Sequence, residues 1–196
     1  MNNIYHSDIY QFNTPVSSYW EATSSDNLNL DKLQKDFTSE IVVIGGGYTG
    51  LLCAINLIEI YNLDVVLVEA GKVGWGASSR NAGFCCLPPS KMSFKKMQYV
   101  YGKQETKKFF KNSVEGANYT KELIENYNID CDVTGENNFV VAHHINKFQQ
   151  IKEQAEAYNL EFGIETQVYS KEEFNEIGHG GTEQFGAFSY KPGFAI

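Results

Sequence analysis

Two short runs of aliphatic residues stand out in the first third of the chain. Residues 40–44 and 64–69 each contain four consecutive Val, Ile or Leu residues, a pattern that predicts buried parallel strands. Between them, residues 51–60 are apolar almost all round the helical period, as expected for a helix packed against a sheet. Strand, helix and strand fit into about 30 residues, which predicts a βαβ unit.

The rest of the chain alternates between helical and extended patterns. Helices are predicted over residues 91–101, 104–127 and 147–158, and strands over 131–134, 138–142 and 185–190. Pro88 and Pro89 break the chain before the first of these helices. Ser170 followed by Glu173 forms a capping box, which predicts a helix start.

Residues 1–37 are polar and aromatic without a sustained period. We interpret them as an arm that packs onto the following domain through its aromatic side chains, with a short helical stretch at 31–36. We expect residues 38–100, which hold the βαβ unit, to form one part of the fold and residues 101–196 to form a further domain.

Composition and charge exclude several functions. Lys plus Arg is 16 and Asp plus Glu is 24, which gives a net charge of −8. Nucleic acids and anionic membranes would repel such a chain. The apolar runs are too short to span a membrane, and the N-terminus shows no secretory signal. We therefore expect a cytoplasmic protein with reduced cysteines, and no metal-binding motif is predicted.

The strongest chemical signal is the glycine turn, residues 45–50, which fits G-x-G-x-x-G. Gly45 permits a tight turn out of the strand, Gly47 lets the backbone approach a pyrophosphate, and Gly50 lets the helix lie close to the strand. The N–H groups of the helix, from Tyr48 and Thr49 onward, then face the phosphates.

An acidic residue at the end of the second strand completes this fingerprint. Glu69 lies where a carboxylate can accept both ribose hydroxyls of an adenosine, and its charge disfavours the 2′-phosphate of NADP. The fingerprint alone does not distinguish NAD from FAD.

The next segment favours FAD. Residues 69–83, together with 41–50, resemble the D-amino-acid oxidase family of FAD-dependent oxidoreductases. Ser18-Tyr19-Trp20 and the glycine turn are typical of its gamma-glutamylputrescine oxidase branch. The resemblance extends from about Ser18 to the C-terminus and weakens after Gly83. It implies an α/β fold, with a Rossmann-type FAD-binding parallel sheet and a partial α+β substrate domain.

The resemblance also implies roles for individual residues. The pyrophosphate would contact the glycine turn, and Glu69 would hold the adenosine ribose, with Ala70 and Lys72 beside it. Ser78 would donate to the pyrophosphate or ribitol, while the flavin ring would lie over residues 80–83. The implied cofactor site thus comprises Gly45, Gly46, Gly47, Tyr48, Thr49, Gly50, Glu69, Ala70, Lys72, Ser78, Arg80, Asn81 and Gly83.

Other candidates have simpler explanations. A surface salt bridge is the alternative for Arg80. Cys85 and Cys86 are more consistent with packing than with a redox role, and His143-His144 with a loop-facing pair than with acid–base catalysis. Catalytic residues are not assigned.

Length leaves two functions open. Family members are longer than 196 residues, and Ile196 falls where the resemblance predicts the middle of the protein. The chain would then be part of a flavoenzyme that oxidises an amine or amino acid by hydride transfer to the flavin. Alternatively it is a non-catalytic nucleotide-binding remnant. An incomplete sheet predicts exposed apolar edges, and hence self-association or pairing with a missing C-terminal half.

Overall fold

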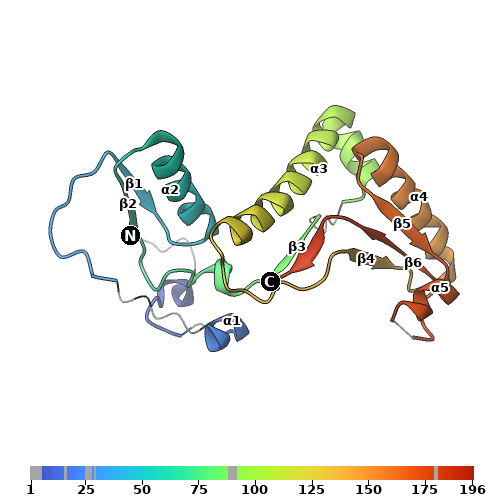
Figure 1. Cartoon of the computed structure of the whole chain (residues 1–196), viewed down its shortest axis with the longest axis horizontal. Helices are drawn as coiled ribbons and strands as arrows, with labels where there is room; N and C mark the ends of the chain where they lie inside the picture. Colours follow the sequence, from blue (N-terminus) through green and yellow to red (C-terminus); the bar gives the residue numbers. More distant parts are fainter. Residues whose placement is uncertain (1–5, 16, 25–27, 29, 88–91, 179–180) are drawn as a thin grey trace. The chain divides into compact units, whose positions relative to one another are not determined.

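The computed structural model describes residues 6–15, 17–24, 28, 30–87, 92–178 and 181–196. These residues form two compact units, which divide between Ala82 and Gly83 (Figure 1). The expected boundary after residue 100 would lie inside a helix (residues 94–126). The observed division comes earlier in the chain, since residues 84–86 already form a strand of the second unit. The division of cofactor and substrate roles between 38–100 and 101–196 stays a prediction.

The first unit is built on the expected βαβ unit. β1 (Ile41–Ile44) is followed by α2 (Tyr48–Tyr61) and β2 (Val65–Val68). The strands are parallel and in register, with Ile41 opposite Val65 and Ile44 opposite Val68. α2 ends at Asn62, whose left-handed backbone lets its N–H bond to the carbonyl of Ile58. This part of the prediction is confirmed.

Burial of β1 differs from the expectation. Its side chains alternate between the two faces of the sheet, so Ile41 and Val43 are half-buried, whereas Val42 is 54% and Ile44 86% exposed. The prediction of a strand buried on both faces is therefore wrong for β1. α2 packs against both strands, and the described residues of this unit place no helix over the face that carries Ile44.

The arm packs through its aromatic residues, as expected. It contains a 3₁₀ turn, η1 (Ser7–Tyr10), and one short helix, α1 (Tyr19–Thr23). The ring of Phe12 packs edge-on against Trp75, with centroids 5.3 Å apart. The helical prediction for residues 31–36 is wrong, since this stretch is irregular and exposed. Six exposed residues are too few to offset the cost of starting a helix.

The second unit contains a three-stranded antiparallel sheet. β4 (Asn138–Val141), β5 (Thr166–Tyr169) and β6 (Ala187–Tyr190) take the order β4-β6-β5. The central β6 is buried along its whole length. Residues 131–134 are not a strand, because only Thr134 forms an isolated bridge, to Ala195. β4 pairs with β6 instead, and all four residues of β6, including the polar Ser189, are buried.

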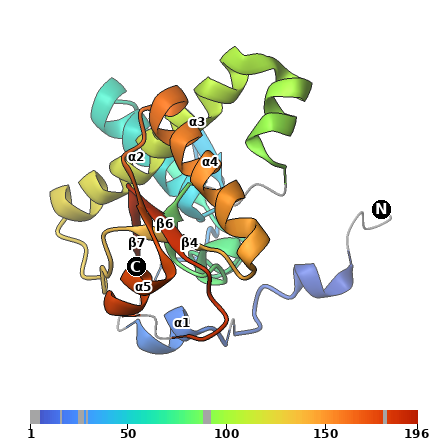
Figure 2. The same ribbon diagram turned by 90° about the vertical axis from the view of Figure 1, so that its right-hand side faces the viewer.

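The helices of this unit match their predictions in kind. α3 (Phe94–Asn126) is broken at Gly102, where φ is +82°, so it corresponds to the two helices predicted there. α4 (Ile145–Phe162) packs on the sheet (Figure 2). α5 (Lys171–Glu176) begins at the predicted capping box of Ser170 and Glu173.

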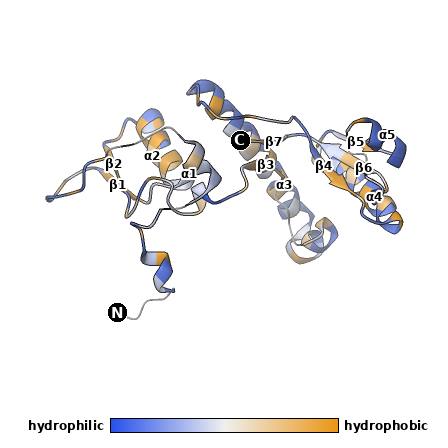
Figure 3. Cartoon of the chain, turned by 90° about the horizontal axis from the view of Figure 1, so that it is seen from below, coloured by the Kyte–Doolittle hydropathy of each residue, from blue (hydrophilic) through white to orange (hydrophobic). Residues whose placement is uncertain are grey.

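In Figure 3, α3 is mostly polar along its length, whereas α2 of the first unit is mostly apolar. None of the helices in the described ranges is long and apolar enough to cross a membrane.

Two strands were not predicted from the sequence. β3 (Phe84–Cys86) and β7 (Gly193–Ala195) form an antiparallel pair, with Cys85 opposite Phe194. The predicted break at Pro88 and Pro89 lies outside the described residues.

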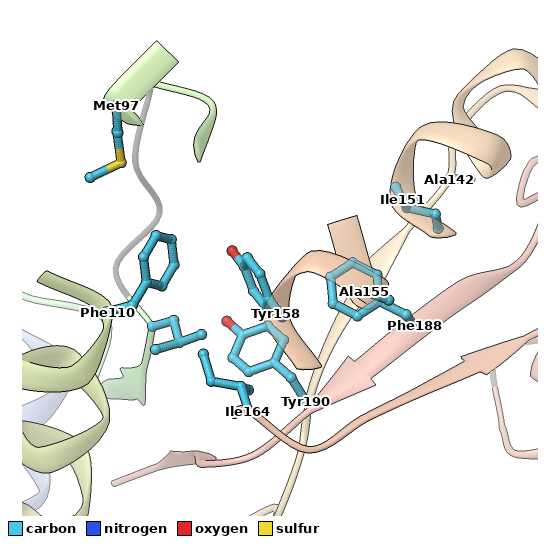
Figure 4. Packing of buried hydrophobic residues seen from close by; sticks show 10 residues of the cluster. Met97, Phe110, Ala142, Ile151, Ala155, Tyr158, Ile164, Phe188 and Tyr190 are labelled. Carbon is cyan, nitrogen blue, oxygen red and sulfur yellow. The ribbon is translucent and has the colours of Figure 1, made fainter. Parts of the chain in front are cut away.

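The core of the second unit is aromatic. Phe110 stacks on Phe162 with centroids 4.2 Å apart, and Tyr158 meets Phe188 and Tyr190 edge-on. Figure 4 shows the two tyrosines side by side, with their hydroxyls on the side that faces Phe110. The buried cluster consists of Leu87, Met97, Phe110, Ala142, Ile151, Ala155, Tyr158, Ile164, Phe188 and Tyr190.

Candidate functional site

The glycine turn has the geometry that its sequence predicts. Gly45 has a φ of +109°, which only glycine adopts without strain, and its N–H extends the β1–β2 ladder to the carbonyl of Val68 at 2.8 Å. A Cβ on Gly50 would collide with the carbonyl oxygen of Gly45. The turn therefore brings the start of α2 directly against the end of β1.

α2 presents its first turn without a side-chain cap. Its N-cap is Gly47, which has no side chain to accept a hydrogen bond. The N–H groups of Thr49 and Gly50 in that turn have no partner within the helix itself. Such a helix start offers donors and the positive end of the helix dipole to an anion.

Ser78 lies next to this helix start. Its Oγ accepts the backbone N–H of Tyr48 at 3.0 Å, and a Cβ on Gly47 would lie 2.9 Å from the same oxygen. The two glycine-rich motifs, 30 residues apart in the chain, therefore meet at one place.

Glu69 joins the same cluster. One carboxylate oxygen accepts the N–H of Gly46 at 2.6 Å and the other accepts the N–H of Gly71 at 2.9 Å. Partial burial by itself raises the pKa of this carboxyl, but the N–H groups of Gly71, Gly46 and Ala70 together hold the pKa below its ordinary value. Glu69 is therefore an anion at neutral pH, and it keeps lone pairs for further donors such as ribose hydroxyls.

The second loop, residues 71–82, is tied to the glycine turn. The N–H of Gly74 donates to the carbonyl of Gly46 at 2.9 Å. A 3₁₀ turn, η2 (Ala77–Ser79), follows, and the Asn81 side-chain amide donates to the carbonyls of Ala77 and Ser78 at 3.2 and 2.9 Å.

The remaining predicted residues lie at the rim or elsewhere. Ala70 is exposed. Lys72 is exposed and pairs with Glu21 of the arm at 3.3 Å. Arg80 donates from Nε to the carbonyl of Trp75 at 3.1 Å, and its guanidinium lies 4.7 Å from the centre of the Trp75 ring. Gly83 belongs to the second unit, where its carbonyl accepts the N–H of Ile196 at 3.1 Å.

Sequence reasoning assigned no role to Trp75 and treated Trp20 only as part of a motif. Both indoles donate to backbone carbonyls, Trp75 of the second loop to Thr14 of the arm and Trp20 of the arm to Asn81 of the second loop. Tryptophan is scarce in this chain, with two residues in all, and both lie in or beside segments already singled out. The position of both tryptophans in or beside these segments is the sequence feature that could have indicated a role for them.

The second unit holds a separate concave site of about 1110 Å³. It is mainly apolar, and the aromatic rings of Phe110, Tyr158 and Tyr190 contribute to its wall. Burial raises the pKa of the Tyr158 and Tyr190 hydroxyls, so both act as neutral hydrogen-bonding groups.

Cys85 and the His143-His144 pair keep their simpler explanations in the part of the chain that the structure describes. Burial, with Cys86 and Cys131 nearby, raises the pKa of the Cys85 thiol, which disfavours a reactive thiolate. His144 caps α4, with Nδ1 accepting the N–H of Asn146 at 3.2 Å. His143 is exposed beside it.

Comparison with known proteins gives a family match over most of the chain. The DAO family model, described as FAD dependent oxidoreductase, matches residues 40–195. Gamma-glutamylputrescine oxidoreductase of Escherichia coli is 36% identical over 117 residues, which cover 60% of this chain and 27% of that protein. A probable oxidoreductase of Haemophilus influenzae, OrdL, is 28% identical over 63% of this chain and 28% of its own length.

Solved structures support the same fold. Glycine oxidase from Bacillus cereus superposes with a TM-score of 0.56 at 18% identity, over 81% of this chain and 40% of that one. L-alpha-glycerophosphate oxidase from Mycoplasma pneumoniae, solved with FAD bound, gives 0.57 at 20% identity, over 82% and 39%. The α/β fold class, the family and its cofactor, FAD, are confirmed by these matches. The chain spans about a quarter of the length of the curated relatives it matches.

Proposed function

We propose that this chain, which belongs to the DAO family of FAD-dependent oxidoreductases, binds FAD in its first unit as part of an amine- or amino-acid-oxidising enzyme. The observation that carries the proposal is the meeting of both glycine-rich motifs at the start of α2. Ser78 touches Tyr48 there, and Glu69 holds Gly46.

The residues present fit this cofactor. The pyrophosphate would lie against the glycine turn, where N–H groups of the first helical turn are available. A side chain in place of Gly47 would crowd this position, since its Cβ would lie 2.9 Å from Ser78 Oγ. The Glu69 carboxylate would accept the adenosine ribose hydroxyls, with Ala70 and Lys72 near that edge. Ser78 would face the middle of the cofactor, and Arg80 and Asn81 the flavin side. Arg80 adds positive charge for a dianionic ligand.

The reaction is proposed from the relatives. The chemistry that bound FAD supplies is acceptance of a hydride at N5 from the C–H bond beside an amine, which leaves an imine for water to hydrolyse. Similarity to gamma-glutamylputrescine oxidoreductase supports an extended amine or amino acid as the substrate class. The chain's own part is to bind and orient the cofactor.

Exposed apolar positions support a partner. Val42 and Ile44 of β1 project from an uncovered face, and we propose that this face is covered by a second copy or by another polypeptide.

We also propose a reducing, cytoplasmic location, since the four cysteines are all free thiols: Cys53, Cys85, Cys86 and Cys131. Counting reactive thiols in freshly prepared protein tests the latter.

The test of function has two stages. Protein reconstituted with FAD should keep flavin absorbance through gel filtration at near 1:1 stoichiometry. Addition of candidate amines under anaerobic conditions should then bleach the flavin bands. Retained flavin without bleaching by any amine favours a nucleotide-binding module without catalysis, and a colourless protein contradicts the cofactor proposal itself.

A further inference from the structure

The arm and the second loop hold each other through a reciprocal pair of hydrogen bonds. Trp75 of the loop donates from Nε1 to the carbonyl of Thr14 in the arm at 2.8 Å. Trp20 of the arm donates from Nε1 to the carbonyl of Asn81 in the loop at 2.7 Å. Each partner is 61 residues away in the chain, and the arm is fastened to the loop at two points, Trp75 and Asn81.

Three further contacts reinforce this pair. The Phe12 ring lies edge-on to Trp75 at 5.3 Å. The Phe12 backbone passes so close to Gly71 that a Cβ there would lie 3.1 Å from its carbonyl oxygen. Lys72 pairs with Glu21 at 3.3 Å. Aromatic packing, close backbone approach and an ion pair thus all join the same two segments.

From the loop, the contacts continue to the candidate phosphate site. The Asn81 amide bonds to the carbonyl of Ser78 at 2.9 Å, and Ser78 Oγ accepts the N–H of Tyr48 at 3.0 Å. The chain of contacts therefore runs from Trp20 through Asn81 and Ser78 to the first turn of α2. On the other side, Trp75 carries the Arg80 guanidinium over its ring at 4.7 Å.

Neither segment has regular structure sufficient to hold this arrangement alone. The loop contains only the three-residue η2 among its described residues. The arm contains the four-residue η1 and five-residue α1, both far shorter than a helix that is stable by itself. The loop is also held at the glycine turn, where the N–H of Gly74 donates to the carbonyl of Gly46 and Ser78 Oγ accepts the N–H of Tyr48. The arm contacts fasten Gly71, Lys72, Trp75 and Asn81 of the loop in addition, and they offset part of its conformational entropy.

We propose that the N-terminal arm is a strap that holds the second loop in its cofactor-receiving conformation, with Trp20 and Trp75 as positioning residues. Trp20 sets Ser78 through Asn81, and Trp75 sets Arg80. Removal of the strap should loosen the loop and weaken FAD binding without changing any residue that touches the cofactor. The inference rests on the proposed function only for the identity of the ligand.

The experiment compares Trp20→Phe and Trp75→Phe, which keep an aromatic ring but lose the N–H donor, with Trp20→Ala. Tyr61→Phe is the matched control, because Tyr61 is 66% exposed at the end of α2. Amide hydrogen exchange of residues 71–82 is measured without FAD, and FAD affinity is measured by titration. We expect exchange to rise by about fivefold or more in Trp20→Phe, and the FAD dissociation constant by roughly tenfold, equal to 1.4 kcal/mol.

Intrinsic fluorescence gives an independent readout, since the chain has two tryptophans, of which Trp20 lies in the strap and Trp75 in the loop. In Trp20→Phe, the emission of Trp75 should shift to the red as its surroundings loosen. Unchanged exchange in residues 71–82 and unchanged emission in all three variants would overturn the strap. If the wild-type protein binds no FAD, the proposed function fails, and exchange without FAD alone then decides whether the arm orders the loop.

Discussion

The carboxylate of Glu69 accepts the backbone N–H of Gly46 at 2.6 Å, which joins the end of β2 to the turn that follows β1. The same carboxylate accepts the N–H of Gly71, at the start of the second loop. One side chain therefore fixes the two segments between which the cofactor is proposed to lie. Its charge and its geometry can be tested separately.

Glu69→Gln should weaken both the fold and FAD binding. The amide has one acceptor oxygen where the carboxylate has two, so a backbone N–H is left facing an NH₂ group. The expected loss in free energy of unfolding is about 1–3 kcal/mol, measured by urea denaturation. Glu122→Gln, an exposed position on α3, is the matched control and should change nothing. Equal stabilities of the two variants would contradict this role of Glu69.

The same carboxylate predicts a pH dependence. Its pKa in the folded protein lies below the ordinary value of 4.5. The stabilisation is therefore fully present above that value and is lost as the pH falls through the lower folded pKa. Between about pH 5 and pH 3, the melting temperature of wild type should approach that of Glu69→Gln. A constant difference between the two proteins across this range would count against the assignment.

Gly50→Ala should disrupt the turn. The added Cβ would collide with the Gly45 carbonyl, so α2 must move away from β1. We expect a loss of about 1–3 kcal/mol in unfolding free energy together with loss of FAD binding. Gly116→Ala is the control, since nothing lies within 4 Å of a Cβ there, and a helix interior should gain about 0.5–1 kcal/mol. Similar melting curves for both variants would refute the close approach.

The acidic residue also predicts nucleotide selectivity. ADP should compete with FAD, whereas an ADP carrying a 2′-phosphate should compete roughly tenfold less well, because like charges repel beside Glu69. In Glu69→Gln the difference between the two competitors should shrink. A competition titration that shows no preference in wild type would place the adenosine elsewhere.

The uncovered face of β1 predicts association. Ile44, which is 86% exposed, should lie in a contact between chains. Ile44→Thr should raise the dissociation constant of self-association roughly tenfold, as seen by light scattering over a dilution series. Ile129→Thr, at an exposed Ile in the second unit, should leave it unchanged. If the wild-type protein is monomeric at all concentrations, self-association through the β1 face is contradicted.

Local rules explain what the sequence could predict. The βαβ unit and the glycine turn follow from residue spacing, and the capping box of Ser170 and Glu173 is a four-residue pattern. The order β4-β6-β5 and the pair β3-β7 depend on contacts between distant segments, for which a short strand carries no local signature. The exposure of Ile44 depends on what covers the sheet, which the apolar run cannot encode.

The strap shows the same limit at the candidate site. Gly46, Ser78 and Glu69 could be predicted as candidates because family motifs mark them. Trp20 and Trp75 each donate a hydrogen bond to a backbone carbonyl 61 residues away. Any residue type can supply a backbone carbonyl, so the sequence does not mark the acceptor. Only the three-dimensional structure connects them.

The central claim, that this chain binds FAD, is tested most directly by titrating the refolded, cofactor-free protein with FAD. Binding is monitored by the quenching of flavin fluorescence and by calorimetry. We predict saturable binding of one FAD per chain, weakened in Glu69→Gln and lost in Gly50→Ala. Absence of saturable binding in a wild-type chain whose circular dichroism shows the expected helices and strands would contradict it.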